Sequence, residues 1–202
     1  IIVLTCVVFL PLLISLWTSF TPFKLTKPDT LYRFVGLRNY ERLIGDYDFW
    51  VAFGRTVLFL TIALNLELVF GLGIALLINK ITYAQKTLRT LMMFPMMFSP
   101  ILVGFQWKYI FNDNIGLLNN FLREFGVINP IPWLVDATLA NFSIMAAEIW
   151  SSTSVFAILL LAGLMGIPKD PIEAAKVDGC NSWQVFKNIT LPFLMPFIFI
   201  AM

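Results

Sequence analysis

The chain alternates between long hydrophobic runs and polar connections. A helix needs about 20 apolar residues to cross the core of a bilayer, and five runs reach or begin such a length, at residues 1–20, 51–78, 88–111, 139–165 and 191–202. Helices satisfy their own backbone hydrogen bonds inside lipid. The pattern therefore predicts an all-α, polytopic transmembrane helical bundle with five spans, of which the first and last are truncated.

The composition supports a membrane protein and excludes several other classes. Of the 202 residues, 59% are hydrophobic and 13% are charged, whereas soluble domains average about 25% charged residues. The net charge of +2 is too small to indicate a nucleic-acid partner, and the chain has no histidine. We expect no metal site and no cofactor. Cys6 and Cys180 are far apart and form no CxxC pattern, so we expect no disulfide.

Glycine and proline positions refine the interpretation of individual spans. Pro95 and Pro100 both fall inside the third run, which predicts a kinked or broken helix there. The Gly71–Gly73 segment lies within an apolar helix, follows no strand and lacks the full GxGxxG spacing, so it indicates close helix packing rather than a nucleotide site. No Walker sequence occurs. We therefore expect that ATP is neither bound nor hydrolysed by this chain.

The spans divide the connections between the two sides of the membrane. Residues 21–50 and 112–138 share one side, and residues 79–87 and 166–190 share the other. Lys and Arg are denser in the second pair of loops but more numerous in the first. The positive-inside rule therefore leaves the orientation open.

Residues 166–191 have the local features of a helix–turn–helix. Asp170 can cap a helix, with Pro171 at its first position and Glu173 three residues after the cap. Gly179 can supply the left-handed residue that ends this helix. We expect Asn181 or the following serine to cap a second short helix, and the next membrane span to begin near Pro192.

This loop resembles the EAA loop of permease subunits of bacterial ATP-binding-cassette importers. The resemblance rests on the Glu-Ala-Ala triplet, the glycine four residues after it and the Ile-x-Leu-Pro segment at its end. It implies a cytoplasmic loop that docks on a separate ATPase through Glu173, Ala174, Ala175, Asp178, Gly179, Ile189, Leu191 and Pro192. Glu173 has two alternative roles, capping its own helix or pairing with a basic residue of the ATPase. A partner-free connector is the alternative for the whole loop.

Other segments resemble the sugar-permease branch of these importers, which transports maltose, other oligosaccharides and glycerol phosphate. The matching segments are 34–40, 94–95 with Pro100, Trp107, 111–112, 116–119, Trp150, 161–164 and 167–168. The resemblance implies one permease domain over residues 1–202, as a fragment of a six-span core in the bacterial inner membrane. It also implies a sugar substrate, a second permease subunit and an extracytoplasmic substrate-binding protein.

Polar residues inside the spans are the candidates for the translocation path. Ionisable residues in membrane spans indicate function, and Glu67 and Glu148 are such residues. Glu148, Trp150 and Ser152 offer the hydrogen-bonding groups and aromatic face that a sugar requires. Bonding between helices is the alternative for all of them, and we favour it for Glu67. An ion-coupled secondary transporter using these glutamates is the alternative function, and a membrane-embedded enzyme is disfavoured by the lack of histidine.

Overall fold

The computed structural model describes residues 2–81 and 83–202, and every regular element in these ranges is helical. Ile1, where the predicted first span begins, lies outside them. The elements are α1 (Ile2–Ser19), η1 (Pro28–Tyr32), α2 (Arg38–Ile44), α3 (Tyr47–Lys80), α4 (Gln85–Met93), η2 (Pro95–Met97), α5 (Pro100–Ile110), α6 (Leu117–Glu124), α7 (Ala137–Met165), α8 (Lys169–Val177), α9 (Ser182–Val185), η3 (Phe186–Thr190) and α10 (Leu191–Ala201). They form two compact units, residues 1–58 and 59–202, whose boundary falls within α3.

Contacts between the start of α2 and the end of α1 hold the first unit together. Asn39 donates hydrogen bonds from its side-chain amide to the carbonyl oxygens of Ser19 and Thr21, both at 2.8 Å. The Tyr40 hydroxyl donates to the Ser19 hydroxyl at 2.8 Å. Gly36 turns the chain with a φ of 61°. The segment 34–40, which the resemblance singles out, therefore anchors the polar connection to the first helix.

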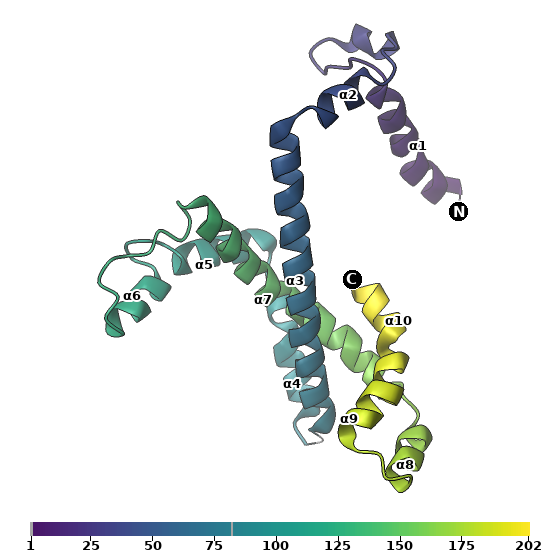
Figure 1. The fold of residues 1–202 in the computed structure, drawn as a ribbon, viewed down its shortest axis with the longest axis vertical. Helices are drawn as coiled ribbons and strands as arrows, with labels where there is room; N and C mark the ends of the chain where they lie inside the picture. The colour runs from purple at the N-terminus through teal and green to yellow at the C-terminus, as the bar shows by residue number, and fades with distance from the viewer. Residues whose placement is uncertain (1, 82) are drawn as a thin grey trace. The chain divides into compact units, whose positions relative to one another are not determined.

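In the second unit α7 is the central helix. It contacts α4, η2, α5 and α10, and Figure 1 shows it crossing the part of α3 that belongs to this unit. The core of the unit comes from α3, α7 and α10 and consists of Ala75, Ile78, Leu160, Leu161, Leu164 and Leu194. These side chains lie at helical spacing on α3 and α7, so each helix buries one stripe of its surface.

The crossing of α3 over α7 depends on the absence of a side chain at Gly71. A Cβ atom built there would lie 2.6 Å from Cβ of Phe156 and 3.1 Å from the backbone nitrogen of Ala157. A Cβ built at Gly73 would have no atom within 4 Å. The prediction of close helix packing in this segment is confirmed for Gly71, whereas Gly73 makes no close contact.

The third hydrophobic run is a broken helix, as its prolines predict. The axis turns by 88° between Gln85–Met97 and Pro100–Ile110. Pro95 and Pro100 lack the backbone N–H that would continue the helix. Ser99, which precedes Pro100, is extended, with φ −61° and ψ 138°, as the ring of a following proline demands.

By length and composition, three helices can cross a membrane, or four if the bent pair forms one span. The three are Tyr47–Lys80, Ala137–Met165 and Ser182–Ala201. The apolar helix Thr5–Ser19 is shorter than this criterion requires among the described residues. The all-α membrane bundle is confirmed in type, and the count of five spans remains a prediction.

Candidate functional site

The helix α8 (Lys169–Val177) carries the Glu-Ala-Ala triplet, and it begins earlier than expected. Its N-cap position is Pro168, and no side chain caps it. The expectation that Asp170 caps this helix with Glu173 in a capping box is wrong. Pro168, which lies at φ −58° and ψ 143°, already sets the direction of the chain, so Asp170 falls inside the first turn. There its carboxylate can still interact favourably with the positive end of the helix dipole.

The turn after α8 has the predicted glycine. Gly179 adopts a φ of 82°, a conformation that costs an L-residue about 1–2 kcal/mol. The backbone N–H of Cys180 donates to the carbonyl oxygen of Ala175 at 2.9 Å, which closes the end of the helix. Asp178 is the C-cap residue of α8.

The next helix begins with a complete capping box. The Asn181 side chain accepts a hydrogen bond from the backbone N–H of Gln184 at 2.9 Å, and the Gln184 side chain accepts one from the backbone N–H of Asn181 at 2.8 Å. Of the two capping residues expected from the sequence, Asn181 is the one used. Such a reciprocal pair fixes the point at which the helix starts.

The helix α10 begins at Leu191, beside Pro192 as expected, but no break separates it from the short helix before it. Residues Ser182–Ala201 form one helix, and residues Phe186–Thr190 within it are a π-helical segment. The wider i→i+5 spacing absorbs an extra residue. Ile189, Leu191 and Pro192 are therefore helical positions, and Thr190 between them is buried.

Much of the loop surface is exposed, including part of the triplet and two large apolar side chains. Glu173 and Ala174 are exposed, while Ala175 is half-buried. Val177 and Trp183 are 87% and 67% exposed. Val177 lies at the end of α8 and Trp183 on α9, and exposed apolar residues of this kind are found at protein-binding surfaces.

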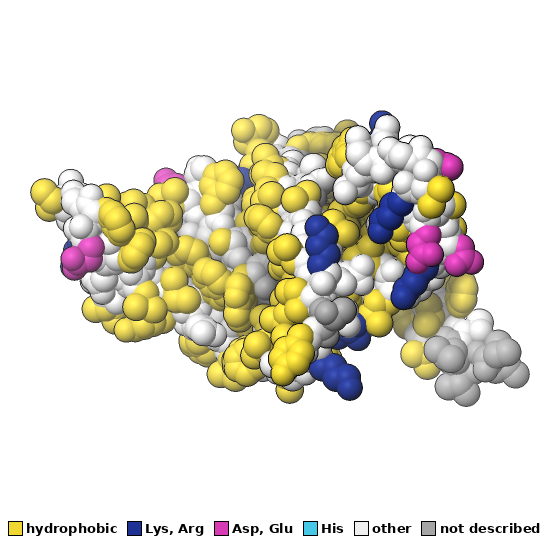
Figure 2. All heavy atoms as spheres, turned by 90° about the horizontal axis from the view of Figure 1, so that it is seen from below, with side chains coloured by type: hydrophobic (Ala, Val, Ile, Leu, Met, Phe, Trp, Pro, Cys, Tyr) yellow, Lys and Arg dark blue, Asp and Glu magenta, His cyan; other side chains and the backbone are white. Residues whose placement is uncertain are grey.

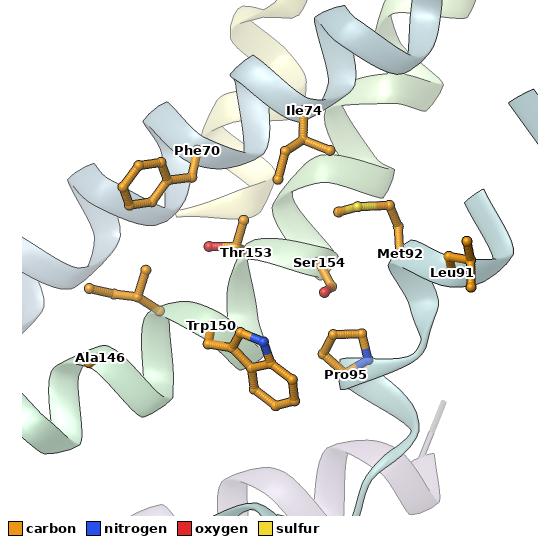
Figure 3. A pocket seen from close by; sticks show the side chains of 10 residues that line it. Phe70, Ile74, Leu91, Met92, Pro95, Ala146, Trp150, Thr153 and Ser154 are labelled. Carbon is orange, nitrogen blue, oxygen red and sulfur yellow. The ribbon is translucent and has the colours of Figure 1, made fainter. Parts of the chain in front are cut away.

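The polar residues of the spans form two groups rather than one. Ser152 donates a hydrogen bond to the carboxylate of Glu148 at 2.8 Å, one turn apart on α7. Trp150 lies on another face of α7, where it lines a hollow of about 550 Å³ (Figure 3). Its indole ring packs edge-on against Trp107 of α5, with ring centroids 5.9 Å apart. The structure thus joins Glu148 to Ser152 and separates both from Trp150.

This hollow, the span pocket, lies beside the break in the third run. Figure 3 shows its walls coming from α3, α4, η2 and α7. Its lining residues are Phe70, Ile74, Leu91, Met92, Pro95, Ala146, Ile149, Trp150, Thr153 and Ser154. The Thr153 hydroxyl is buried and has no hydrogen-bond partner among the described residues. The pocket is therefore mainly apolar, with one tryptophan and two hydroxyl groups.

Several of these residues were not selected from the sequence as candidates. Thr153 and Ser154 belong to the hydroxyl run 151–154, which is visible in the sequence. Helical spacing could have grouped them with Trp150, since positions three and four apart share a face. Phe70 and Met92 carried no signal, because their approach to α7 depends on the packing of the helices.

Glu67 is buried at the crossing rather than in the pocket. It is 3% exposed and lies one turn before Gly71 on the face of α3 that packs inward. The carboxyl group of Glu148 is within electrostatic range of it. A buried position at a helix crossing favours the structural role that the sequence suggested for Glu67.

Metal chemistry has no evident site in the described part of the chain. No group of three or more His, Cys, Asp or Glu side chains there could hold a metal ion. Cys6 and Cys180 are both free thiols.

Comparison with known proteins gives concordant results. A family model described as "Binding-protein-dependent transport system inner membrane component" matches residues 67–202. The chain is 36% identical over 198 residues to the trehalose/maltose transport system permease protein MalF of Thermococcus litoralis, covering 96% of this chain and 65% of that protein. It is 36% identical over 167 residues to the osmoprotective compounds uptake permease protein GgtC of Synechocystis, covering 80% of this chain and 59% of that protein.

A solved structure shares the fold. It is a bacterial ABC transporter involved in the import of the acidic polysaccharide alginate, one chain of which superimposes with a TM-score of 0.80. The two chains are 23% identical, and the match covers 98% of this chain and 66% of the other. The present chain thus spans just under two thirds of the length of the proteins it matches.

Proposed function

The chain belongs to the family of binding-protein-dependent transport system inner membrane components, and from this premise we propose that it is the membrane-spanning subunit of an ATP-driven importer for a carbohydrate. In this proposal it resides in the bacterial inner membrane as a multi-pass protein. It pairs with a second permease subunit and receives substrate from an extracytoplasmic binding protein. A separate ATPase supplies the energy, so this chain is not itself an enzyme.

The observation that carries the proposal is the exposed surface of α8 and the residues that follow it. Glu173, Ala174 and Val177 are exposed. The C-terminal end of the helix is held in place by the left-handed Gly179 and by contact with α9. The small side chain of Ala174 lets a partner approach the helix backbone closely. Glu173 does not cap its own helix, which leaves pairing with a basic residue of the ATPase as its proposed role.

The proposed mechanism uses two states of the complex. ATP binding closes the ATPase dimer and moves the docked 171–178 segment, and this movement turns the spans from inward-facing to outward-facing. Hydrolysis of ATP then resets them. The EAA residues, from Glu173 to Pro192, are in this account the mechanical link and take no part in the chemistry.

We expect Glu173→Gln in the full-length permease to weaken assembly with its ATPase about tenfold, since about 1.4 kcal/mol is the scale of a lost charge-assisted contact at an interface. The helix should persist, because Glu173 makes no cap. Co-purification and ATP-driven uptake measure the effect. Glu124→Gln, which removes an exposed carboxylate from α6, is the matched control. Equal assembly of both variants would refute the docking role of Glu173.

The family premise also bears on the translocation path, for which we retain Glu148, Trp150 and Ser152 and add the hydroxyl groups of the span pocket. The aromatic face of Trp150 stands in that pocket and suits the apolar face of a sugar ring. Ser152 and Glu148, linked at 2.8 Å, offer a pre-oriented donor and acceptor.

Trp150→Leu is expected to raise the substrate concentration for half-maximal uptake about tenfold, a loss of about 1.4 kcal/mol in binding. The control is Phe142→Leu, which removes an aromatic ring that is 53% exposed on the same helix and does not line the span pocket. Uptake of radiolabelled sugar into proteoliposomes containing the assembled importer measures both. An unchanged transport affinity for Trp150→Leu would remove this residue from the path.

The ion-coupled alternative receives no support from the family or from the position of Glu67. A buried carboxyl group at a tight helix crossing has little room for a bound ion. Uptake that collapses with the ion gradient while ATP is present would revive that alternative.

A further inference from the structure

A second hollow, of about 310 Å³, lies where the end of α3 meets α8 and the start of the last helix, and we call it the basal pocket. Its lining residues are Leu76, Lys80, Lys176, Cys180, Ser182, Val185, Phe186 and Thr190. Figure 2 shows Lys and Arg side chains beside hydrophobic ones on this end of the molecule. All of the lining residues belong to the unit 59–202.

The polar part of the basal pocket is positively charged. Lys80 and Lys176 come from helices 96 residues apart in the chain, and no carboxylate lines the pocket with them. Neither ammonium group forms an ion pair with any described residue. The hydroxyl of Ser182 is a further hydrogen-bond donor at the same place. Two unpaired ammonium groups and a hydroxyl provide the chemistry that binds a phosphate group.

The rest of the lining is apolar. Leu76, Val185 and Phe186 form this part of the wall. A free anion gains nothing from such a wall, whereas a molecule with hydrocarbon attached to its anionic group fills both parts. The pocket therefore matches an amphiphile better than it matches inorganic phosphate.

The pocket lies at the end of α3, a helix that by length and composition can span a membrane. The helix α3 has 34 residues, about 51 Å at 1.5 Å per residue, which exceeds the ~30 Å hydrocarbon core. The apolar run of this helix ends at Ile78 and Lys80 is the last residue of the helix, so we infer that the Lys80 ammonium group lies in the headgroup region, with Leu76 one turn deeper. Lipid headgroups and the upper parts of acyl chains occupy these same depths.

We propose that the basal pocket binds one anionic phospholipid, with its phosphate between Lys80 and Lys176 and its acyl chains against Leu76, Val185 and Phe186. Bound in this way, the lipid links the end of α3 to the loop that carries α8. This proposal concerns a lipid site and does not depend on docking of an ATPase.

Cys180 provides a direct test, because its thiol lines the pocket. The full-length permease is prepared with Cys180 as its only cysteine, and the rate of alkylation by N-ethylmaleimide is measured in detergent without its ATPase. Phosphatidylglycerol should slow alkylation along a saturating curve, to about one tenth at about ten times its dissociation constant. Phosphatidylcholine and inorganic phosphate should leave the rate within about twofold of the lipid-free value at the same concentrations.

The charge requirement is tested by comparing the ratio of rates with and without lipid within each variant. Lys80→Gln and Lys176→Gln should lose most of the protection, whereas Lys80→Arg should retain it. Lys187→Gln is the matched control, because Lys187 is an exposed residue near the pocket that does not line it.

Three results would overturn the lipid site. The first is equal protection by inorganic phosphate, which would indicate a simple anion site. The second is protection that appears only when the ATPase is added, which would make the pocket part of a protein interface. The third is an alkylation rate that phosphatidylglycerol does not change.

Discussion

Replacing Gly71 by leucine is expected to lower the free energy of unfolding of the full-length permease by about 3 kcal/mol, the upper part of the usual range for overpacking a core. The first added atom alone would lie 2.6 Å from Cβ of Phe156 and 3.1 Å from the nitrogen of Ala157. Neither of these atoms can rotate away, since one is a Cβ fixed to its backbone and the other is main chain. The two helices must therefore separate, and contacts around Ala63 and Ala75 on the same stripe weaken with them.

Gly73→Leu is the matched control for this substitution. It lies on the same helix two residues later, and a Cβ there meets nothing within 4 Å. We expect a change of about 1 kcal/mol or less, in the stabilising direction, because leucine has the better helix propensity. Thermal unfolding in detergent compares the two proteins. Equal unfolding temperatures would show that α3 and α7 do not cross at Gly71.

Asn119→Ala is expected to cost about 3 kcal/mol, because it leaves several polar groups without partners and each such loss costs about 1–3 kcal/mol. Asn119 is 2% exposed. Its amide donates to the carbonyl oxygens of Asp113 and Ile131, both at 3.0 Å. Its oxygen accepts from the backbone N–H of Ile131 at 3.2 Å and from the indole N–H of Trp133 at 2.9 Å. One side chain thus ties together the connection between α5 and α7.

Asn120→Ala tests whether the loss of stability in Asn119→Ala comes from the four hydrogen bonds of the Asn119 side chain. Asn120 is the neighbouring residue, and it makes one 3.3 Å bond to the carbonyl oxygen of Ile115 and accepts a weak one from Arg123. Its loss should cost about 1 kcal/mol or less, as exposed hydrogen bonds contribute little. Limited proteolysis should cut residues 125–136 faster in Asn119→Ala than in Asn120→Ala. Identical cleavage rates would contradict the central role of Asn119.

The sequence predicts those parts of the fold that depend on neighbours along the chain. The runs of apolar residues locate the helices, and Pro95 with Pro100 locates the 88° bend, because proline acts on its own turn of helix. The π-helical segment 186–190 and the continuity through Pro192 were not predictable in this way. Both depend on how residues 182–201 pack, and Pro192 directly follows the π-helical turn in the first turn of α10.

In the candidate site, too, features set by neighbouring residues were predictable, and features set by the packing of distant helices were not. Gly179 and Asn181 were identified from the sequence, because a left-handed turn and an N-cap require particular residues locally. Asp170 was assigned wrongly, since Pro168 starts the helix two residues earlier. The hydrogen bond between Ser152 and Glu148 joins residues four apart on one helix, a spacing from which it could have been anticipated. The basal pocket could not, because Lys80 meets Lys176 only through the packing of distant helices.

The unbroken helix Ser182–Ala201 has a mechanical consequence. Its first turn is fixed by the capping box of Asn181 and Gln184, and Leu194 further along packs in the core with residues of α7. Between these points the helix is continuous and includes the π-helical turn Phe186–Thr190, so under the proposed docking a force applied at the loop passes along a single helix to the core. Movement of the loop that carries α8 would then reach Leu194 and its contacts with α7 without passing through a flexible connection.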